Sequence, residues 1–134
     1  MGQRDKSSHV ILVVDDQESN RDLLNAILTS QGYRVIEASN GLEAVKLATR
    51  ERPDLVIMDL SMPVIDGFGA LRLLREVPHI RDVPVVACTA HDTSTHKHQA
   101  LRVGFSDFLS KPIDFRKLDV LLNHFLKTDS HTLL

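Results

Sequence analysis

The feature that most constrains the fold is an alternation of short apolar runs with longer amphipathic stretches. Residues 10–14 are a continuous series of Val, Ile and Leu, which is typical of a strand buried on both faces. A helical pattern follows over about 20–30, and this pair of patterns recurs along the chain. Strands alternating with helices predict a parallel sheet with helices on both faces and right-handed crossovers. We therefore expect a single doubly wound α/β domain.

Periodicity and the residues that begin or end helices place the individual elements. Gly104 is suited to end the fourth helix, and Asp114 to cap the last one. The apolar stripe of the first helix is expected to be Leu23, Leu24, Ile27 and Leu28, and the core side of the fourth Ala100, Leu101 and Val103. We expect strands at about 10–14, 34–38, 55–58, 83–88 and 108–109, and helices at about 20–30, 42–52, 67–76, 94–103 and 115–126.

Length and composition limit the class of protein. The chain has 134 residues, the size of one domain, and 43% of them are apolar, enough for one core. No apolar run is long enough to span a membrane and the first residues are polar, so we expect a cytoplasmic protein without membrane contact. The net charge of −2 and the absence of a basic block argue against nucleic-acid binding. Cys88 is the only cysteine and is interpreted as a small buried hydrophobe.

Polar residues follow the expected strands where each one ends. Asp15 and Asp16 follow the first strand, Asp59 the third, Thr89 the fourth and Lys111 the fifth. In an open parallel sheet these carboxyl ends lie along one edge, where ligands bind. Residues nearly a hundred positions apart are therefore expected to meet in one cleft.

The residue types at this edge suit phosphoryl chemistry. Three clustered carboxylates repel one another, and Mg²⁺, a cation with oxygen ligands, would offset their charge. Lys111 and Thr89 could hold phosphoryl oxygens while Asp59 acts as a nucleophile toward phosphorus. Taken singly, each has a plain structural explanation: Asp15 and Asp16 as helix caps, Asp59 as a loop acid, Thr89 as a capping hydroxyl and Lys111 as a surface lysine. Their conjunction at four strand ends favours the functional interpretation.

At this point the sequence resembles the receiver domain of two-component response regulators, over about residues 9–127. The matching segments are Val-Val-Asp-Asp at 13–16, Met-Asp-Leu-Ser-Met-Pro at 58–63 followed by Asp66-Gly67, Cys-Thr-Ala at 88–90 and Ser-Lys-Pro at 110–112. The resemblance implies a flavodoxin-like (βα)5 fold with strand order 2-1-3-4-5. Residues 1–8 and 128–134 are then expected to be a frayed N-terminus and a C-terminal tail.

The resemblance implies a role for each acid. Asp59 would accept a phosphoryl group from a histidine kinase or a phosphotransfer protein. Asp16, Asp59 and the backbone carbonyl of Ser61 would bind Mg²⁺ directly, and Asp15 would act through a metal-bound water. The side chains of Ser61 and His91 lie at positions that tune how fast the phosphoryl group is lost to water.

It also implies a conformational switch. Thr89 would move to hydrogen-bond the phosphoryl group, Lys111 would contact it from the other side, and Phe108 would turn inward when Thr89 moves. The bond before Pro112 is expected to be cis. The output face would consist of the fourth helix, fifth strand and fifth helix, where a downstream protein or a second copy of the chain would bind.

Several alternatives remain at this stage. The leading interpretation is a signalling module, not an enzyme, whose only chemistry is its own phosphorylation and dephosphorylation. The chain could equally be a receiver from a larger hybrid histidine kinase. A phosphatase of the haloacid dehalogenase type uses similar groups, but its nucleophile ends the first strand in an Asp-x-Asp pattern. An inactive receiver is disfavoured because every position of the acceptor site carries the residue type that phosphorylation requires. A transition-metal site at His96 and His98 is also disfavoured, because residues two apart on a helix point in different directions.

Overall fold

In the computed structural model, five strands alternate with five helices, and residues 8–62, 65–90 and 94–126 are described. The expected frayed termini lie outside the described residues, apart from Ser8. The strands are β1 (Val10–Val14), β2 (Arg34–Ala38), β3 (Leu55–Asp59), β4 (Val85–Thr89) and β5 (Asp107–Ser110). The helices are α1 (Glu18–Ser30), α2 (Gly41–Glu51), α3 (Gly67–Arg75), α4 (Ser94–Val103) and α5 (Phe115–Phe125).

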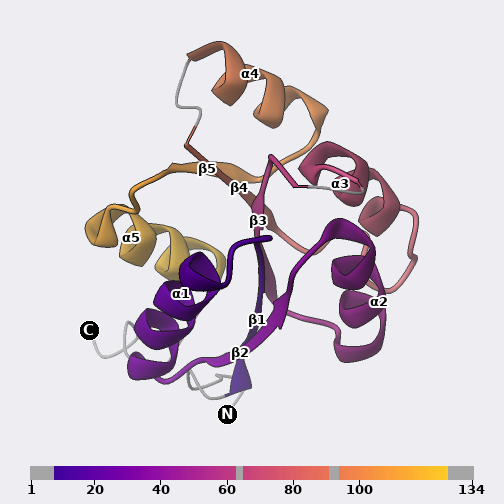
Figure 1. Cartoon of the computed structure of the whole chain (residues 1–134). Helices are drawn as coiled ribbons and strands as arrows, with labels where there is room; N and C mark the ends of the chain where they lie inside the picture. Colours follow the sequence, from indigo (N-terminus) through magenta and orange to yellow (C-terminus); the bar gives the residue numbers. More distant parts are fainter. Residues whose placement is uncertain (1–7, 63–64, 91–93, 127–134) are drawn as a thin grey trace.

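All strands belong to one parallel sheet in the order β2-β1-β3-β4-β5. Helices α1 and α5 cover one face of the sheet, and α2, α3 and α4 cover the other (Figure 1). This arrangement confirms the doubly wound, flavodoxin-like (βα)5 fold. Every residue of β1, β3 and β4 is buried, as continuous apolar runs in a sheet covered on both faces require.

Two cores form because successive strand residues point to opposite faces of the sheet. Alternate residues of β1 and β3 pack with Leu24 and Leu28 of α1 and with the buried leucines of α5. The remaining strand residues pack with small side chains of α2, α3 and α4, among them Ala44, Ala70 and Ala100. The sheet is thereby fixed from both sides, and its carboxyl edge becomes a rigid support.

The structure corrects three predicted core residues. Leu23 and Val103 are each 49% exposed, and Leu101 is 40% exposed. Leu23 directly precedes Leu24, and neighbours on a helix point about 100° apart, so only one of the two can face the sheet. Leu101 is turned away from buried Ala100 for the same reason. Val103 is the last residue of α4, immediately before the chain leaves the helix.

Element ends differ from the prediction where backbone hydrogen bonding decides them. β4 begins at Val85 rather than at residue 83, because Pro84 has no N–H to donate to the sheet. β3 and β4 extend through Asp59 and Thr89, so both residues end strands rather than follow them.

Two predicted helix ends are confirmed. Asp114 accepts hydrogen bonds from the backbone N–H groups of Arg116 and Lys117, and Gly104 has φ of 116°, which suits the end of α4. Among the residues that the structure describes, no helix combines the length and the apolar character needed to cross a membrane.

Candidate functional site

The polar residues predicted to converge do lie together at the carboxyl edge of the sheet. Asp15 and Asp16 directly follow β1, Asp59 ends β3, Thr89 ends β4 and Lys111 directly follows β5. Because these four strands are parallel, the topology delivers all five residues to one end of the sheet.

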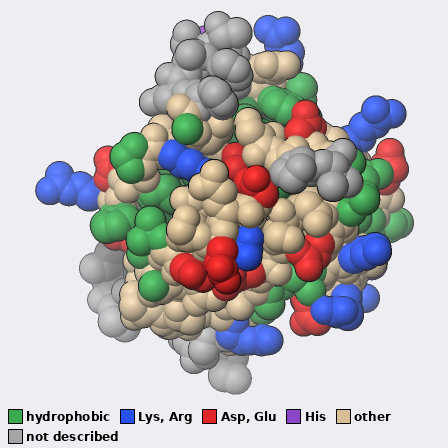
Figure 2. Space-filling model, in the orientation of Figure 1, with side chains coloured by type: hydrophobic (Ala, Val, Ile, Leu, Met, Phe, Trp, Pro, Cys, Tyr) green, Lys and Arg blue, Asp and Glu red, His purple; other side chains and the backbone are tan. Residues whose placement is uncertain are grey.

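Lys111 lies between the two most buried acids. Its Nζ is 2.8 Å from Oδ2 of Asp15 and 3.3 Å from Oδ2 of Asp59. The two carboxyl side chains are 5% and 8% exposed, whereas that of Lys111 is 21% exposed. In Figure 2 acidic side chains gather near the centre of the visible face, with a basic side chain among them. The plain explanation of Lys111 as a solvated surface lysine is therefore wrong.

The charges at this site are only partly balanced. Burial raises the pKa of the Asp59 carboxyl above its ordinary value, although the Ser61 N–H and the Lys111 ammonium oppose that rise. For Lys111, burial acts to lower the pKa, but the hydrogen bond to Asp15 and the charges of Asp59 and Asp15 outweigh it and raise the pKa. Lys111 is thus held in its charged form, while ionised Asp59 carries an energetic cost.

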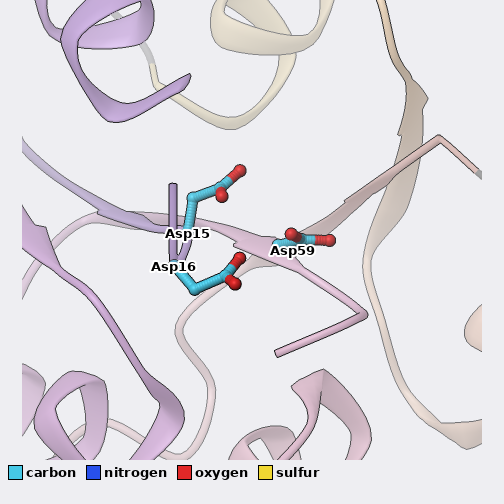
Figure 3. Close-up of side chains that lie close together, drawn as sticks. All are labelled: Asp15, Asp16 and Asp59. Carbon is cyan, nitrogen blue, oxygen red and sulfur yellow. The ribbon is translucent and has the colours of Figure 1, made fainter. Parts of the chain in front are cut away.

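The three acids form a group that fits a divalent cation. One carboxylate oxygen from each of Asp15, Asp16 and Asp59 lies within 4.8 Å of the others. Figure 3 shows the carboxyl groups of Asp15 and Asp16 directed toward the side on which Asp59 lies. Opposite ligands of octahedral Mg²⁺ are about 4.2 Å apart, so these oxygens can share one ion, directly or through its water molecules. Asp16 is exposed, which leaves the ion a route from solvent.

The backbone around Asp59 is fixed by its own loop. Oδ1 of Asp59 accepts a hydrogen bond from the N–H of Ser61 at 3.1 Å, and the N–H of Gly67 donates to the carbonyl of Leu60 at 3.0 Å. A Cβ at Gly67 would lie 2.7 Å from the carbonyl oxygen of Asp59 and 2.9 Å from Cα of Leu60. Only glycine therefore lets α3 begin this close to the end of β3. For Ser61, this N–H is the observed contact, and its carbonyl as a metal ligand stays a prediction.

The turn that carries Asp15 and Asp16 is held by residues that the sequence did not single out. Arg21 of α1 donates from Nη1 to the carbonyl of Asp15 at 2.8 Å and pairs through Nε with Glu37 of β2 at 3.2 Å. Asn25 donates to the second oxygen of Glu37 at 2.6 Å. No spacing rule marks these residues, because the contacts depend on how α1 lies against β2.

The carboxylate of Asp15 is occupied on both oxygens. Oδ1 accepts the N–H of Gln17 at 2.9 Å, and Oδ2 accepts from Lys111. The first contact fixes the turn before α1. The N-cap position of that helix is Gln17, whose side chain makes no capping hydrogen bond, so neither acid occupies it. Helix capping alone therefore does not account for this pair of acids.

Thr89 and Phe108 lie on the neighbouring strands β4 and β5 and are deeply buried. Each is 1% exposed, and Ala87, two residues before Thr89, is the register partner of Phe108. Residues two apart on a strand share a face, so Thr89 and Phe108 lie on the same side of the sheet. The Phe108 ring is inward in this structure. The bond between Lys111 and Pro112 is cis, as predicted.

The remaining predicted residues divide into three cases. His91 lies outside the described residues, as do the side chains of 94–96, which include His96. His98 is exposed, and the only cluster of potential metal ligands among the described residues is the acidic one. Cys88 is buried, and burial raises the pKa of its thiol to about 12, in agreement with the prediction of an inert side chain.

A doubly wound parallel sheet with an acid cluster and a lysine at its carboxyl edge is the arrangement expected of a receiver-type signalling domain. The model of the response regulator receiver domain matches residues 11–123, so the chain belongs to the receiver-domain family of two-component systems. It is 46% identical over 112 residues to the response regulator PleD of Caulobacter vibrioides and covers 24% of that protein. It is 39% identical over 116 residues to the protein PilH of Pseudomonas aeruginosa and covers 96% of it.

Solved structures agree with this assignment. The chemotaxis protein CheY4 of Vibrio cholerae is similar with a TM-score of 0.82 and 30% identity, over 88% of this chain and 98% of CheY4. The receiver domain of the sensor histidine kinase PA1611 of Pseudomonas aeruginosa, with a magnesium ion in its active-site cleft, is 36% identical with a TM-score of 0.80 over 87% and 96%. The receiver domain of Ssk1 of Saccharomyces cerevisiae, in complex with the histidine phosphotransfer protein Ypd1, is 28% identical with a TM-score of 0.81 over 87% and 88%.

Proposed function

We propose that this receiver domain accepts a phosphoryl group on Asp59 from a phosphohistidine of a kinase or phosphotransfer protein, with Mg²⁺ bound at the acid cluster. The observation that carries the proposal is the position of Lys111 Nζ, within 3.3 Å of Asp59 in a cluster of three acids. One ammonium cannot neutralise three carboxylates, and a divalent cation removes the remaining imbalance.

In the transfer step, a carboxylate oxygen of Asp59 attacks phosphorus. The bond from phosphorus to the donor imidazole nitrogen breaks, and that nitrogen keeps the electron pair. Lys111 and Thr89 would hold the equatorial oxygens, and the Ser61 N–H, which donates to the Asp59 carboxylate, would help to keep it in position. Bound Mg²⁺ would supply charge neutralisation through Asp16, Asp59 and the Ser61 carbonyl, with Asp15 acting through water. Ser61 and His91 would tune hydrolysis.

The signal would leave through Thr89 and Phe108. A phosphoryl group that hydrogen-bonds Thr89 in one conformation favours that conformation by the contact it gains there. Phe108 lies on the same face of the sheet, so its ring is the neighbour that would respond. Helix α4 covers this face with one small buried residue, Ala100, among its described side chains. The face formed by α4, β5 and α5 would then change its affinity for a downstream protein or a second copy of the chain.

The structures of PA1611 and Ssk1 support a kinase or phosphotransfer partner. Relatives of both lengths occur, since the chain covers most of PilH but a quarter of PleD. The proposal therefore applies to the domain, whether alone or within a larger kinase, and it implies a cytoplasmic location. The phosphatase alternative has no support in the family match, and a filled acceptor site argues against an inactive receiver.

Intact-protein mass spectrometry tests the proposal. With acetyl phosphate and Mg²⁺, we expect one phosphoryl group on the wild type and none on Asp59→Asn. Asp54→Asn, at the other end of β3, should accept the group as the wild type does. An unchanged phosphorylated peak in Asp59→Asn would refute the assignment of the acceptor.

A further inference from the structure

The two adjacent acids at the end of β1 are held in very different ways. Asp15 is fixed at every polar group: its N–H donates to the carbonyl of Ala38, its carbonyl accepts from Arg21, and its carboxylate oxygens accept from Gln17 and Lys111. The exposed carboxylate of Asp16 has no hydrogen bond or ion pair within the described part of the chain. No side-chain contact therefore helps to aim it, and the direction of its Cα–Cβ bond is set by the backbone.

The backbone unit that decides this direction is the peptide group between Asp15 and Asp16. The peptide group is planar, so the chain rotates only about the bonds on either side of it, ψ of Asp15 and φ of Asp16. Rotation about these bonds moves Cα and Cβ of Asp16 relative to Asp59. The carbonyl oxygen of the peptide group is the atom that Arg21 holds at 2.8 Å. A charged donor to a carbonyl makes a stronger hydrogen bond than a neutral one, so this contact limits the rotation of the peptide group.

Arg21 is itself fixed by a second layer of contacts. Its Nε pairs with Glu37 on β2, and Asn25, one helical turn further along α1, holds the other oxygen of Glu37. The Arg21 side chain is 16% exposed and that of Glu37 is 30% exposed. The planar guanidinium can contact the carbonyl and the carboxylate at once, which an ammonium group cannot reproduce with the same geometry.

We propose that Arg21 is a positioning residue for the metal site: it fixes the Asp15–Asp16 peptide group and thereby aims the Asp16 carboxylate at Asp59. This inference rests on the proposed Mg²⁺ site. Residues that orient ligands without touching the ion change metal affinity by about 10- to 100-fold in other proteins. We expect a loss in the lower part of that range, because Asp16 remains present and only its orientation is released.

The test is a calorimetric Mg²⁺ titration of the full chain. Arg21→Met should bind Mg²⁺ about 10-fold more weakly than the wild type. Arg50→Met is the matched control, because it removes the same charge from a side chain that is 72% exposed and pairs with Glu51. Arg21→Lys should restore part of the affinity, and Asn25→Ala, which loosens Glu37 without altering Arg21, should lose less than Arg21→Met.

Two further readouts separate positioning from general stability. In metal-free protein, the hydrogen-bonded amides of Asp15 and Gln17 should exchange hydrogen faster in Arg21→Met, whereas core amides of β3 should not. On an Asp16→Asn background, Arg21→Met should cause little additional loss of Mg²⁺ affinity, because the oriented carboxylate is already gone.

Equal Mg²⁺ affinity in Arg21→Met and wild type would overturn the inference and leave the proposed function intact. Equal losses in Arg21→Met and Arg50→Met, or a full additional loss on the Asp16→Asn background, would also overturn it. Absence of Mg²⁺ binding by the wild type would overturn the proposed metal site together with the inference. If Arg21→Met does not fold, the affinities of Arg21→Lys and Asn25→Ala decide, and wild-type affinity in both would refute it.

Discussion

Strand β3 has an aspartate at each end, and the two are used in opposite ways. Asp54, directly before the strand, accepts the N–H of Val10 through its carboxylate and donates its own N–H to the carbonyl of Val10. Asp59, the last residue, faces Lys111, Asp15 and Asp16 instead. One carboxylate satisfies the backbone of a neighbouring strand, and the other is gathered with like charges that only a further cation can balance. The Asp54 carboxylate stabilises the fold by accepting a backbone hydrogen bond, whereas the Asp59 carboxylate, which lies near other carboxylates, indicates a ligand site.

The largest difference between the two ends is expected in metal binding. Asp16→Ala removes an acid from the cluster at the end of β3, so Mg²⁺ affinity should fall by more than an order of magnitude and phosphorylation should nearly stop. Asp54→Asn should bind Mg²⁺ as the wild type does. Calorimetric titration measures both affinities, and wild-type affinity in Asp16→Ala would show that the acid cluster at the end of β3 is not the Mg²⁺ site.

Gly67 tests whether the backbone at the end of β3 depends on the close approach of α3. In Gly67→Ala the new methyl group would press on backbone atoms of Asp59 and Leu60, so we expect a loss of about 1–3 kcal/mol in unfolding free energy together with slower phosphorylation. Gly69→Ala is the control. Its nearest contacts would be at 3.6 Å, and the gain in helix propensity should stabilise by up to about 1 kcal/mol. Urea denaturation compares the two, and equal stabilities would show that the close approach at Gly67 is unimportant.

Removing the carboxylate at the start of β3 should weaken the fold. Asp54→Ala leaves the N–H of Val10 without its side-chain acceptor, and we expect a cost of about 1–3 kcal/mol in unfolding free energy. Phosphorylation of the folded fraction should be unchanged. A variant as stable as the wild type in urea would mean that this end of the strand does not depend on Asp54.

Removing the carboxylate at the other end of β3, by Asp59→Asn, should instead raise the unfolding free energy. The pKa of Asp59 is raised above 3.8 by burial, so its contribution to stability is full below that pH and is lost as pH rises through the native pKa. Without Mg²⁺, Asp59→Asn should therefore exceed the wild type in stability by a margin that grows over this interval and then levels off. Urea denaturation from about pH 4 to about pH 8 measures the margin, and a wild type more stable than Asp59→Asn at neutral pH would contradict the account.

The smallest effect is expected at Thr89, which does not take part in the charge cluster. Thr89→Ala should still accept a phosphoryl group on Asp59, but should respond weakly beyond the site, since the differential hydrogen bond is gone. Amide chemical shifts with and without beryllofluoride report the response across residues 94–110. Shifts equal to those of the wild type would show that the signal leaves by another route.

Features of the fold and of the site could be predicted from the sequence where they depend on local patterns and on the parallel topology of the sheet. The strands β1, β3 and β4 and the convergence of Asp15, Asp59 and Lys111 follow from period and topology, because parallel strand ends must share an edge. The contacts of Arg21 with Glu37 and with the carbonyl of Asp15 were not predicted, because they depend on how α1 is oriented against β2. The exposure of Leu101 and Val103 was also missed, since an apolar pattern does not reveal which of two neighbouring residues faces the sheet or how the residue at the helix end is covered. The cis bond at Pro112 was predicted only through family resemblance, as local sequence rarely determines it.

We propose that the charged groups at the end of β3 bind Mg²⁺ and a phosphoryl group on Asp59. A crystal structure of the protein grown with Mg²⁺ and beryllofluoride tests this most directly. We expect beryllofluoride on the Asp59 carboxylate in contact with Thr89 and Lys111, and Mg²⁺ coordinated by oxygens of Asp16 and Asp59. At saturating concentrations of both, an unmodified Asp59, or a metal ion bound away from the acid cluster, would contradict the account.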